Sequence, residues 1–172
     1  MTHIKYANRE DASPSMGYHK KTIATLCYIQ KDDQTLMLHR VKKENDIHAG
    51  KYNGLGGKIE LAENPRSCII REVEEEAGVS IDPIYVANLT FCNLIPGEDW
   101  EVHLFRANGY EGTLTDCVEG DLEWVPNNKV LDLPMWPADS IFLKHLHSKT
   151  FFWGTFWYDN GDLKDYTLEF EK

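Results

Sequence analysis

The segment from Asn64 to Gly78 constrains the fold more than any other part of the chain, because its residue pattern suits a half-buried helix. Asn64 is a favourable N-cap, Pro65 suits the first helical position, and Gly78 suits the C-terminal stop. At about 100° per residue, the aliphatic side chains of such a helix share one arc. They are Ile69, Ile70, Val73 and Ala77. The sequence therefore predicts a helix over residues 65–77 that packs one face into a core.

A second arc of this helix, next to the aliphatic one, concentrates carboxylates. Glu72, Glu75 and Glu76 fall within an arc about 100° wide. Like charges four residues apart destabilise a helix by roughly a few tenths of a kcal/mol, and the helix dipole disfavours anions near the C-terminal end. Bound hard cations would offset both effects, since Mg²⁺ prefers oxygen ligands. A solvated acidic face is the alternative interpretation.

A glycine-dense stretch, Gly54-Leu55-Gly56-Gly57, precedes the helix. Without Cβ atoms, the backbone at Gly56 and Gly57 can approach a metal ion or a phosphate closely. Arg71 lies beside the acidic arc, where it can orient a carboxylate through a bidentate contact. Divalent cations held there would neutralise phosphate charge and lower the pKa of a bound water.

Residues 57–79 match the Nudix box at every specified position: Gly, five residues, Glu, seven residues, Arg-Glu, aliphatic, any residue, Glu-Glu, any residue, Gly, aliphatic. The matching residues are Gly57, Glu63, Arg71, Glu72, Val73, Glu75, Glu76, Gly78 and Val79. At ~7% for each of the seven fixed residues, a chance match somewhere in the chain has a probability of roughly one in a million. The chain thus resembles the Nudix hydrolases.

The resemblance implies an α+β structure with the Nudix fold, an α/β/α sandwich around a central mixed β-sheet. It implies that Glu72, Glu75 and Glu76 ligate Mg²⁺ or Mn²⁺, with the Gly57 carbonyl as a further candidate ligand. Arg71 is implied as a catalytic residue together with Glu72 and Glu75. The implied reaction is attack of water on phosphorus, which releases a nucleoside monophosphate and pyrophosphate from a triphosphate.

Two residues outside the box have implied roles with equally weighted alternatives. Glu119 aligns with an acidic residue that approaches the metal from a loop in relatives, so it is expected to ligate a second ion or to act as the general base. An exposed loop acid is its alternative. Arg40, after the second expected strand, is expected to contact a phosphate, with a surface cation as its alternative.

Beyond the box, the chain resembles the MutT-type 8-oxo-dGTP diphosphatases and their animal counterparts, which hydrolyse oxidised purine nucleoside triphosphates. The similarity spans roughly residues 22–170, with landmarks at 25–26, 51–58, 135–140 and 165–168. It implies that Trp136 stacks on the base while Asn53 and Asp139 read its edge. Alternatives are a core tryptophan and a helix-capping aspartate. The animal enzymes carry two adjacent aspartates where this chain has Ala138-Asp139, which weakens the expectation of broad purine tolerance.

Other substrates and one other class of protein remain as alternatives. A Nudix hydrolase of this kind can act on a nucleotide sugar, a dinucleoside polyphosphate or an ordinary nucleotide. A non-catalytic Nudix-fold binding module is the rival from a different class. The complete box argues against that rival, since such modules often have eroded boxes.

The remaining sequence predicts one domain over residues 21–172, preceded by a leader at 1–20 that is expected to be mobile or loosely docked. Expected strands cover 22–29, 36–41, 84–94, 101–107 and 122–125, with a second helix at about 140–147. Asn160-Gly161 predicts a hairpin between 151–158 and 163–170, because this pair favours a tight β-turn.

Composition and charge limit the partners of the chain. Its 172 residues carry a formal net charge of −10, which argues against binding duplex nucleic acid through phosphate neutralisation. No apolar run approaches the ~20 residues that span a bilayer, and no secretory signal precedes the domain. We therefore expect a cytoplasmic protein with a small nucleotide as its partner. The sequence does not indicate an oligomeric state.

Overall fold

The structure is a computed structural model that describes residues 20–42 and 45–172. The strands of its main sheet are β1 (Lys20–Lys31), β2 (Gln34–His39), β3 (Tyr52–Asn53), β5 (Ile84–Ile95), β6 (Glu98–Asn108), β8 (Asp121–Pro126), β9 (Phe152–Asp159) and β10 (Asp162–Phe170). A separate two-stranded sheet pairs β4 (Val79–Ser80) with β7 (Glu111–Gly112). The helices are α1 (Pro65–Ala77), α2 (Pro137–Phe142) and the 3₁₀ helices η2 (Asn127–Asp132) and η3 (Leu143–His145).

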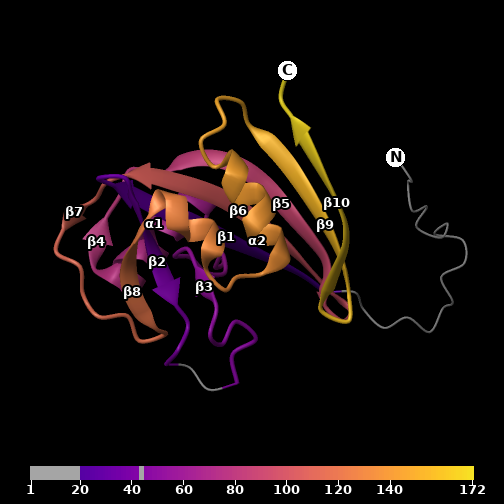
Figure 1. Cartoon of the computed structure of the whole chain (residues 1–172), viewed down its shortest axis with the longest axis horizontal. Helices are drawn as coiled ribbons and strands as arrows, with labels where there is room; N and C mark the ends of the chain where they lie inside the picture. Colours follow the sequence, from indigo (N-terminus) through magenta and orange to yellow (C-terminus); the bar gives the residue numbers. More distant parts are fainter. Residues whose placement is uncertain (1–19, 43–44) are drawn as a thin grey trace, which may run out of the picture.

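The main sheet is mixed, as predicted. Its order is β10-β9-β5-β6-β1-β2-β3, and β8 pairs with the other edge of β2 (Figure 1). β1 runs parallel to β6 and β5 runs parallel to β9, whereas the other pairs are antiparallel. This arrangement places β1 and β6 in the middle of the sheet.

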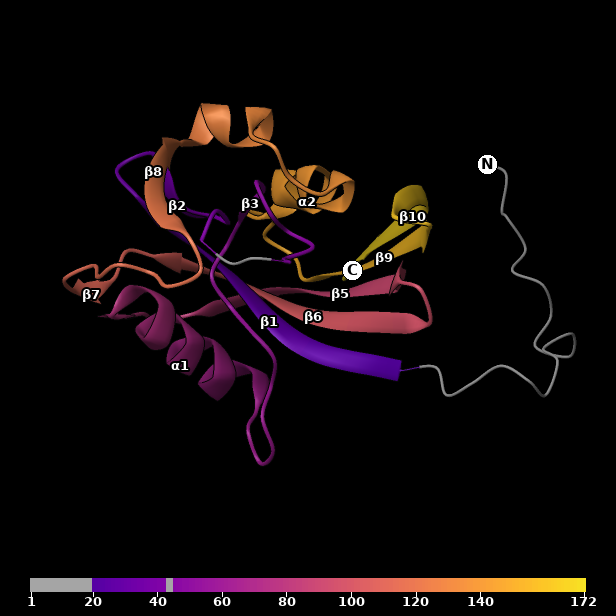
Figure 2. The ribbon, with the colours of Figure 1, turned by 90° about the horizontal axis from the view of Figure 1, so that it is seen from below.

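Helices cover the two faces of this sheet and complete the predicted sandwich. α1 lies on one side of β1 and β6, and α2 and η2 lie on the other (Figure 2). Alternate residues of β1 serve the two sides, since successive strand side chains point to opposite faces. Cys27 and Ile29 pack in the core under α1, and Tyr28 packs in the core under α2. We refer to these as the α1 side and the α2 side.

The ends of α1 follow from local sequence, and its predicted bounds are confirmed. The Asn64 side chain accepts a hydrogen bond from the Ser67 backbone N–H at 3.0 Å, and the Ser67 hydroxyl oxygen accepts one from the Asn64 N–H at 3.1 Å. This reciprocal capping box satisfies two backbone donors at the helix start. Gly78 ends the helix with a φ of 70°, a left-handed conformation that glycine adopts without steric cost.

Some expectations about the other elements were wrong. The second helix begins at Pro137 rather than about 140, because proline takes the first helical position and Trp136 becomes the N-cap residue. It gives way to 3₁₀ geometry at Leu143. The short strands β3, β4 and β7 and the helix η2 were not predicted.

The C-terminal hairpin is confirmed, with β9 paired antiparallel to β10. Asn160 and Gly161 have φ values of 49° and 84°, which the tight turn requires. The expected leader at 1–20 lies outside the described residues except for Lys20, which begins β1. Among the described helices, none has the length and apolar character needed to cross a membrane.

Candidate active site

The three glutamates of the predicted acidic arc sit at different depths on α1. Glu76 is buried, Glu72 is mostly shielded, and Glu75 keeps 61% of its side-chain surface exposed. Ile69 and Val73, on the adjacent arc of the helix, are buried in the core on the α1 side. The acidic arc therefore runs from the core edge to solvent along one flank of the helix.

Arg71 ties this flank to the loop that precedes the helix. Its Nε and Nη2 donate to the two carboxylate oxygens of Glu63 at 2.9 and 3.0 Å, which is a bidentate contact. Its Nη1 donates to Glu72 at 2.8 Å and to Glu75 at 3.2 Å. The Arg71 guanidinium lowers the pKa of Glu63 to about 2. Arg71 thus orients the carboxylates beside it, as its position in the sequence suggested.

The glycine stretch packs closely against β1 and α1. The Gly56 backbone N–H donates to Glu76 Oε2 at 2.9 Å. A Cβ atom at position 57 would collide with the carboxylate group of Glu72. A Cβ atom at position 56 would collide with the carbonyl oxygen of Thr25 on β1. Glycine at both positions therefore lets α1 lie against the strand with its carboxylates pointing at the loop.

The Gly57 carbonyl is engaged elsewhere. Its oxygen accepts hydrogen bonds from the Thr25 backbone N–H at 2.8 Å and from the Thr25 hydroxyl at 3.3 Å. A carbonyl oxygen has two lone pairs, so these two donors use its capacity. The backbone group that contacts the acidic arc is the N–H of Gly56 instead.

Two carboxyl groups of the acidic arc, those of Glu72 and Glu76, have raised pKa values. Burial raises the pKa of Glu76 to about 8, the Gly56 N–H opposes this shift, and the Glu119 and Glu72 carboxylates raise the pKa further. Burial likewise raises the pKa of Glu72, although Arg71 opposes it. Both shifts mean that the ionised carboxylates are disfavoured in the protein alone, and a nearby cation would favour them.

The carboxylates do not form a finished metal site as they stand. Among residues 20–42 and 45–172, no group of three or more His, Cys, Asp or Glu side chains is arranged to hold a metal ion. The contacts of Arg71 give the physical reason, because its Nη1 bonds to both Glu72 and Glu75. These two carboxylates would have to turn from Arg71 to converge on an ion.

Arg40 and Glu119 form an ion pair beside Glu76. Arg40 follows β2, keeps only 12% of its side-chain surface exposed, and bonds through Nε and Nη2 to Asp46 Oδ2 at 2.7 Å each. Its Nη1 donates to Glu119, which lies just before β8. Arg40 is therefore not a free surface cation, and Glu119 is not an isolated loop acid.

The predicted base-binding residues lie on the α2 side. Trp136 and Asp139 belong to the start of α2, and Asn53 belongs to β3. The Tyr52 N–H donates to the Pro134 carbonyl at 2.8 Å, which holds β3 beside the segment that leads into α2. The sequence-predicted residues thus form two groups, Asn53 with Trp136 and Asp139 on the α2 side, and the glutamates with Arg40 and Arg71 at α1.

Trp136 is held by contacts that the sequence did not reveal. Its indole Nε1 donates to His48 Nδ1 at 2.7 Å, and the Tyr158 ring meets it edge-on with centroids 6.4 Å apart. The Lys51 ammonium lies 4.6 Å from its ring centroid. A single histidine in a charged loop gives no signal of this contact, because it depends on the fold.

Asn53 and Asp139 carry buried polar groups on the α2 side. Asn53 Oδ1 is buried and accepts no hydrogen bond from the part of the chain that the structure describes. Asp139 is buried, and burial raises the pKa of its carboxyl group to about 7. Polar groups buried in this way are usually satisfied in native proteins, so these two suit a bound molecule.

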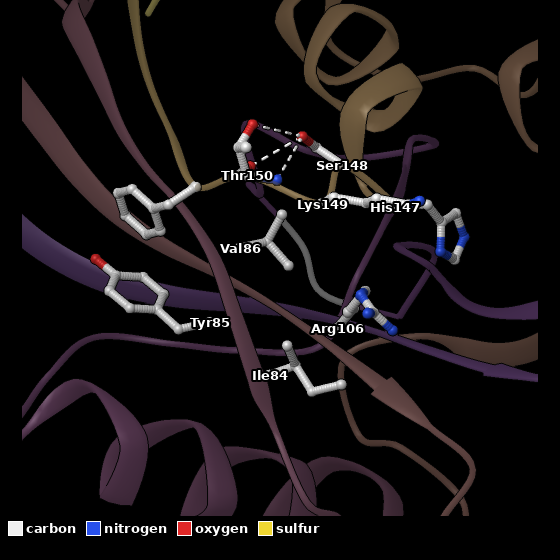
Figure 3. Close-up of a pocket in the computed structure, with 9 residues that line it drawn as sticks. Ile84, Tyr85, Val86, Arg106, His147, Ser148, Lys149 and Thr150 are labelled. Atoms are coloured by element: carbon white, nitrogen blue, oxygen red, sulfur yellow. Dashed lines mark hydrogen bonds between the residues drawn. The ribbon is translucent and has the colours of Figure 1, made fainter. Parts of the chain in front are cut away.

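A cavity of about 290 Å³ is lined by residues that belong to neither of these two groups. It is lined by Ile84, Tyr85 and Val86 at the start of β5, by Arg106 on β6, and by residues 147–151 (Figure 3). None of the predicted site residues lines it. It therefore has no part in the site described above.

Comparisons with known proteins agree with this geometry. The NUDIX domain family matches residues 20–146. An oxidized purine nucleoside triphosphate hydrolase of Danio rerio is 31% identical over 122 residues, which cover 70% of this chain and 78% of that protein. A CTP pyrophosphohydrolase of Escherichia coli is 29% identical over 112 residues, which cover 64% of this chain and 80% of that protein.

A solved structure of a MutT protein from Bacillus halodurans superposes with a TM-score of 0.76 and 30% sequence identity. The superposition covers 86% of this chain and 97% of that chain. The family match spans well over half of the sequence, and the α+β sandwich, its mixed sheet and the glycine-supported acidic helix agree with it. The chain therefore belongs to the Nudix hydrolase family, as a MutT-like enzyme that acts on pyrophosphate bonds.

Proposed function

We propose that the enzyme hydrolyses a nucleoside triphosphate to the monophosphate and pyrophosphate, with 8-oxo-dGTP or a related oxidised purine nucleotide preferred. The observation that carries the proposal is one continuous segment, residues 53–57. It begins at Asn53 on the α2 side and ends at Gly57, against the carboxylate of Glu72. Four residues reach at most about 13 Å when extended, a length that a nucleoside triphosphate can span.

The carboxylates at α1 are proposed to hold Mg²⁺ or Mn²⁺. Glu72, Glu75 and Glu76 would supply the ligands, and Glu119 would join them from its loop. The fit is supported by the raised pKa of Glu76 and Glu72, and by the missing Cβ at Gly57 that admits the Glu72 carboxylate. When bound, the cation would neutralise phosphate charge and lower the pKa of an attacking water. The Gly57 carbonyl is left out, because Thr25 occupies it.

Two arginines would prepare this region for a triphosphate. Arg71 is a positioning residue, because its bidentate contact with Glu63 fixes the guanidinium that orients Glu72 and Glu75. Arg40 is proposed to contact a phosphate through Nη1. Asp46 already holds its Nε and Nη2 edge, so exchange of Glu119 for a phosphate oxygen would leave the guanidinium in place and free Glu119.

The base is proposed to bind on the α2 side. Trp136 offers an aromatic face whose orientation is fixed by His48, and stacking on such a face tolerates any base. Discrimination would come from the unpaired Asn53 oxygen and the buried Asp139 carboxyl group, since buried polar groups penalise a base that cannot complete their hydrogen bonds. The name of the relative from Danio rerio supports an oxidised purine.

A pyrimidine nucleoside triphosphate is the second candidate substrate. The relative named CTP pyrophosphohydrolase favours it, and so does Ala138, which leaves Asp139 as the single carboxylate at the start of α2. Both candidates need the same chemistry at α1 and differ in the base.

A substrate panel separates the two candidates. We would measure kcat/KM with Mg²⁺ for 8-oxo-dGTP, dGTP, CTP, a nucleotide sugar and a dinucleoside polyphosphate. The proposal predicts a kcat/KM for 8-oxo-dGTP at least about 10-fold above that for dGTP, and above that for every other member. The highest value for CTP would support the second candidate, and the highest value for a nucleotide sugar would contradict both.

A further inference from the structure

Two buried tyrosines on the α2 side carry hydroxyl groups without partners. The Tyr28 ring is fully buried and the Tyr158 residue is 2% exposed. Neither O–H has an acceptor among the residues that the structure describes. The backbone N–H groups of Gly54 and Ala138 lie close enough to the Tyr28 and Tyr158 oxygens to lower their pKa. A buried hydroxyl can both donate and accept, and native proteins rarely leave that capacity unused. Both tyrosines therefore suit a molecule that is bound only part of the time.

Asp139 lies within electrostatic reach of both phenols. Burial raises the pKa of Tyr28, and the Asp139 carboxylate raises it further, while the neighbouring Gly54 backbone lowers it. Burial also raises the pKa of Tyr158, again with a contribution from Asp139, while the Ala138 backbone lowers it. The two backbone neighbours place Tyr28 beside the end of β3 and Tyr158 beside the first turn of α2. The charge of Asp139 therefore acts on a phenol from β1 and on a phenol from β9.

Ring packing restricts where the two hydroxyls can point. The Tyr28 ring lies against Phe142, with centroids 6.4 Å apart. The Tyr158 ring meets Trp136 at 6.4 Å and Phe91 at 6.5 Å. Close packing around these rings prevents the side chains from rotating toward another hydrogen-bond partner. A ligand that reaches the α2 side can supply one.

We propose that Tyr28 and Tyr158 are specificity-determining residues, whose hydroxyls bond to the polar edge of the nucleobase beside Asn53 and Asp139. This inference rests on the proposed function, in which the base binds on the α2 side. The Asn53 oxygen can only accept, whereas each phenol can donate. An oxidised guanine matches this set, because it offers carbonyl oxygens to the phenols and N–H groups to Asn53 and Asp139.

The test removes each hydroxyl and changes nothing else. Tyr28→Phe and Tyr158→Phe each delete one hydroxyl whose O–H has no acceptor in the described part of the free protein. Thermal unfolding of both variants should therefore show a Tm equal to or above that of the wild type, because an unpaired buried polar group is lost. Binding of 8-oxo-dGMP, measured by calorimetry, should weaken by about 3- to 10-fold for each variant, as expected for loss of one neutral hydrogen bond.

Two controls isolate the base contact. Deoxyribose 5-phosphate lacks the base, so its binding should be the same in the wild type and both variants. Tyr85→Phe is the matched substitution, because the Tyr85 hydroxyl is already bonded to His103 Nδ1 at 2.6 Å and its residue lines the separate cavity (Figure 3). Tyr85→Phe should leave 8-oxo-dGMP binding unchanged.

The outcomes separate this inference from the proposed function. If wild-type kcat/KM favours 8-oxo-dGTP but both variants bind 8-oxo-dGMP as the wild type does, the tyrosine inference alone is overturned. A lower Tm with unchanged binding would assign the hydroxyls to the free protein and overturn it as well. If wild-type kcat/KM favours CTP, the oxidised-purine proposal fails, and titration with CMP then decides the tyrosines. Unchanged CMP affinity in both variants would overturn their role.

Discussion

The α1 side and the α2 side of the sheet differ in how their polar side chains are satisfied. On the α1 side, Arg71 bonds to Glu63, Glu72 and Glu75, and the Gly56 N–H bonds to Glu76. On the α2 side, oxygen atoms of Asn53, Tyr28 and Tyr158 are buried without partners in the described chain. One region is internally bonded, whereas the other has unused hydrogen-bonding capacity.

The difference has a physical meaning for an enzyme of this family. On the α1 side, the contacts of Arg71 keep the carboxylates of Glu63, Glu72 and Glu75 together, and Glu72 and Glu75 would turn from Arg71 to ligate a cation. Groups that select one base gain from being unpaired, because only the matching base completes their hydrogen bonds. In the proposed function, the chemistry therefore belongs to the α1 side and the choice of base to the α2 side.

The largest effect should follow from Glu75→Gln on the α1 side. Loss of a proposed ligand or acid–base group should lower kcat at least about 100-fold. Because Glu75 is 61% exposed, the Tm should remain near that of the wild type. Glu74→Gln is the matched control, an exposed neighbour outside the acidic arc, and should retain wild-type kcat. Near-normal kcat in Glu75→Gln would exclude Glu75 from the site.

A methyl group at position 57 should have the next largest effect. In Gly57→Ala, the added Cβ would collide with the Glu72 carboxylate and displace it from the loop. We expect kcat to fall by roughly 10-fold or more, in the range of a lost acid–base or electrostatic contribution. Kinetics on the two best substrates should show the same factor. Unchanged kcat would mean that the position of Glu72 is unimportant for the reaction.

Arg71→Lys tests whether the internal bonding on the α1 side matters. Lysine cannot reproduce the bidentate contact with Glu63, so the carboxylates lose their fixed partner while the charge is kept. We expect kcat to fall by about 3- to 10-fold, a smaller effect than in Gly57→Ala, since the lost hydrogen bonds between the two charged groups only position the carboxylates. A kcat equal to that of the wild type would show that charge alone suffices at position 71.

The smallest effect concerns stability and pH on the α2 side. The pKa of Asp139 rises from 3.8 to about 7 on burial, so folding favours its protonated form. Its stabilising contribution is complete below about pH 4 and is lost as pH rises toward 7. The wild type should therefore lose stability between about pH 4 and pH 7, whereas Asp139→Asn, which cannot ionise there, should not. The difference in Tm between the variant and the wild type should increase by a few degrees over this range and then level off. A difference that is independent of pH would contradict the buried, unpaired carboxylate.

The sequence predicts the α1 side better than the α2 side for a related reason. The caps of α1, Asn64 and Gly78, act within a few residues, so both ends of the helix can be read locally. The Arg71–Glu63 contact also joins residues eight positions apart. In contrast, the Trp136–His48 hydrogen bond on the α2 side joins residues 88 positions apart, and only the fold brings them together.

Elements that depend on distant partners were missed or misplaced. β4 and β7 have two residues each, which is too short for a periodic pattern, and their pairing depends on the chain reversal between them. The start of α2 was placed too late, although Pro137 could have marked it. Tyr28 carried an unused signal, since a phenol within an aliphatic strand needs a partner for its hydroxyl.

The division between the two sides is tested most directly by one kinetic comparison. We would measure kcat/KM for 8-oxo-dGTP, dGTP and CTP in the wild type, Glu75→Gln and Asp139→Ala. The account predicts that Glu75→Gln lowers all three values by the same factor, and that Asp139→Ala lowers only the value for 8-oxo-dGTP, by about 10-fold or more. A change of base preference in Glu75→Gln, or an equal loss for all three substrates in Asp139→Ala, would contradict it.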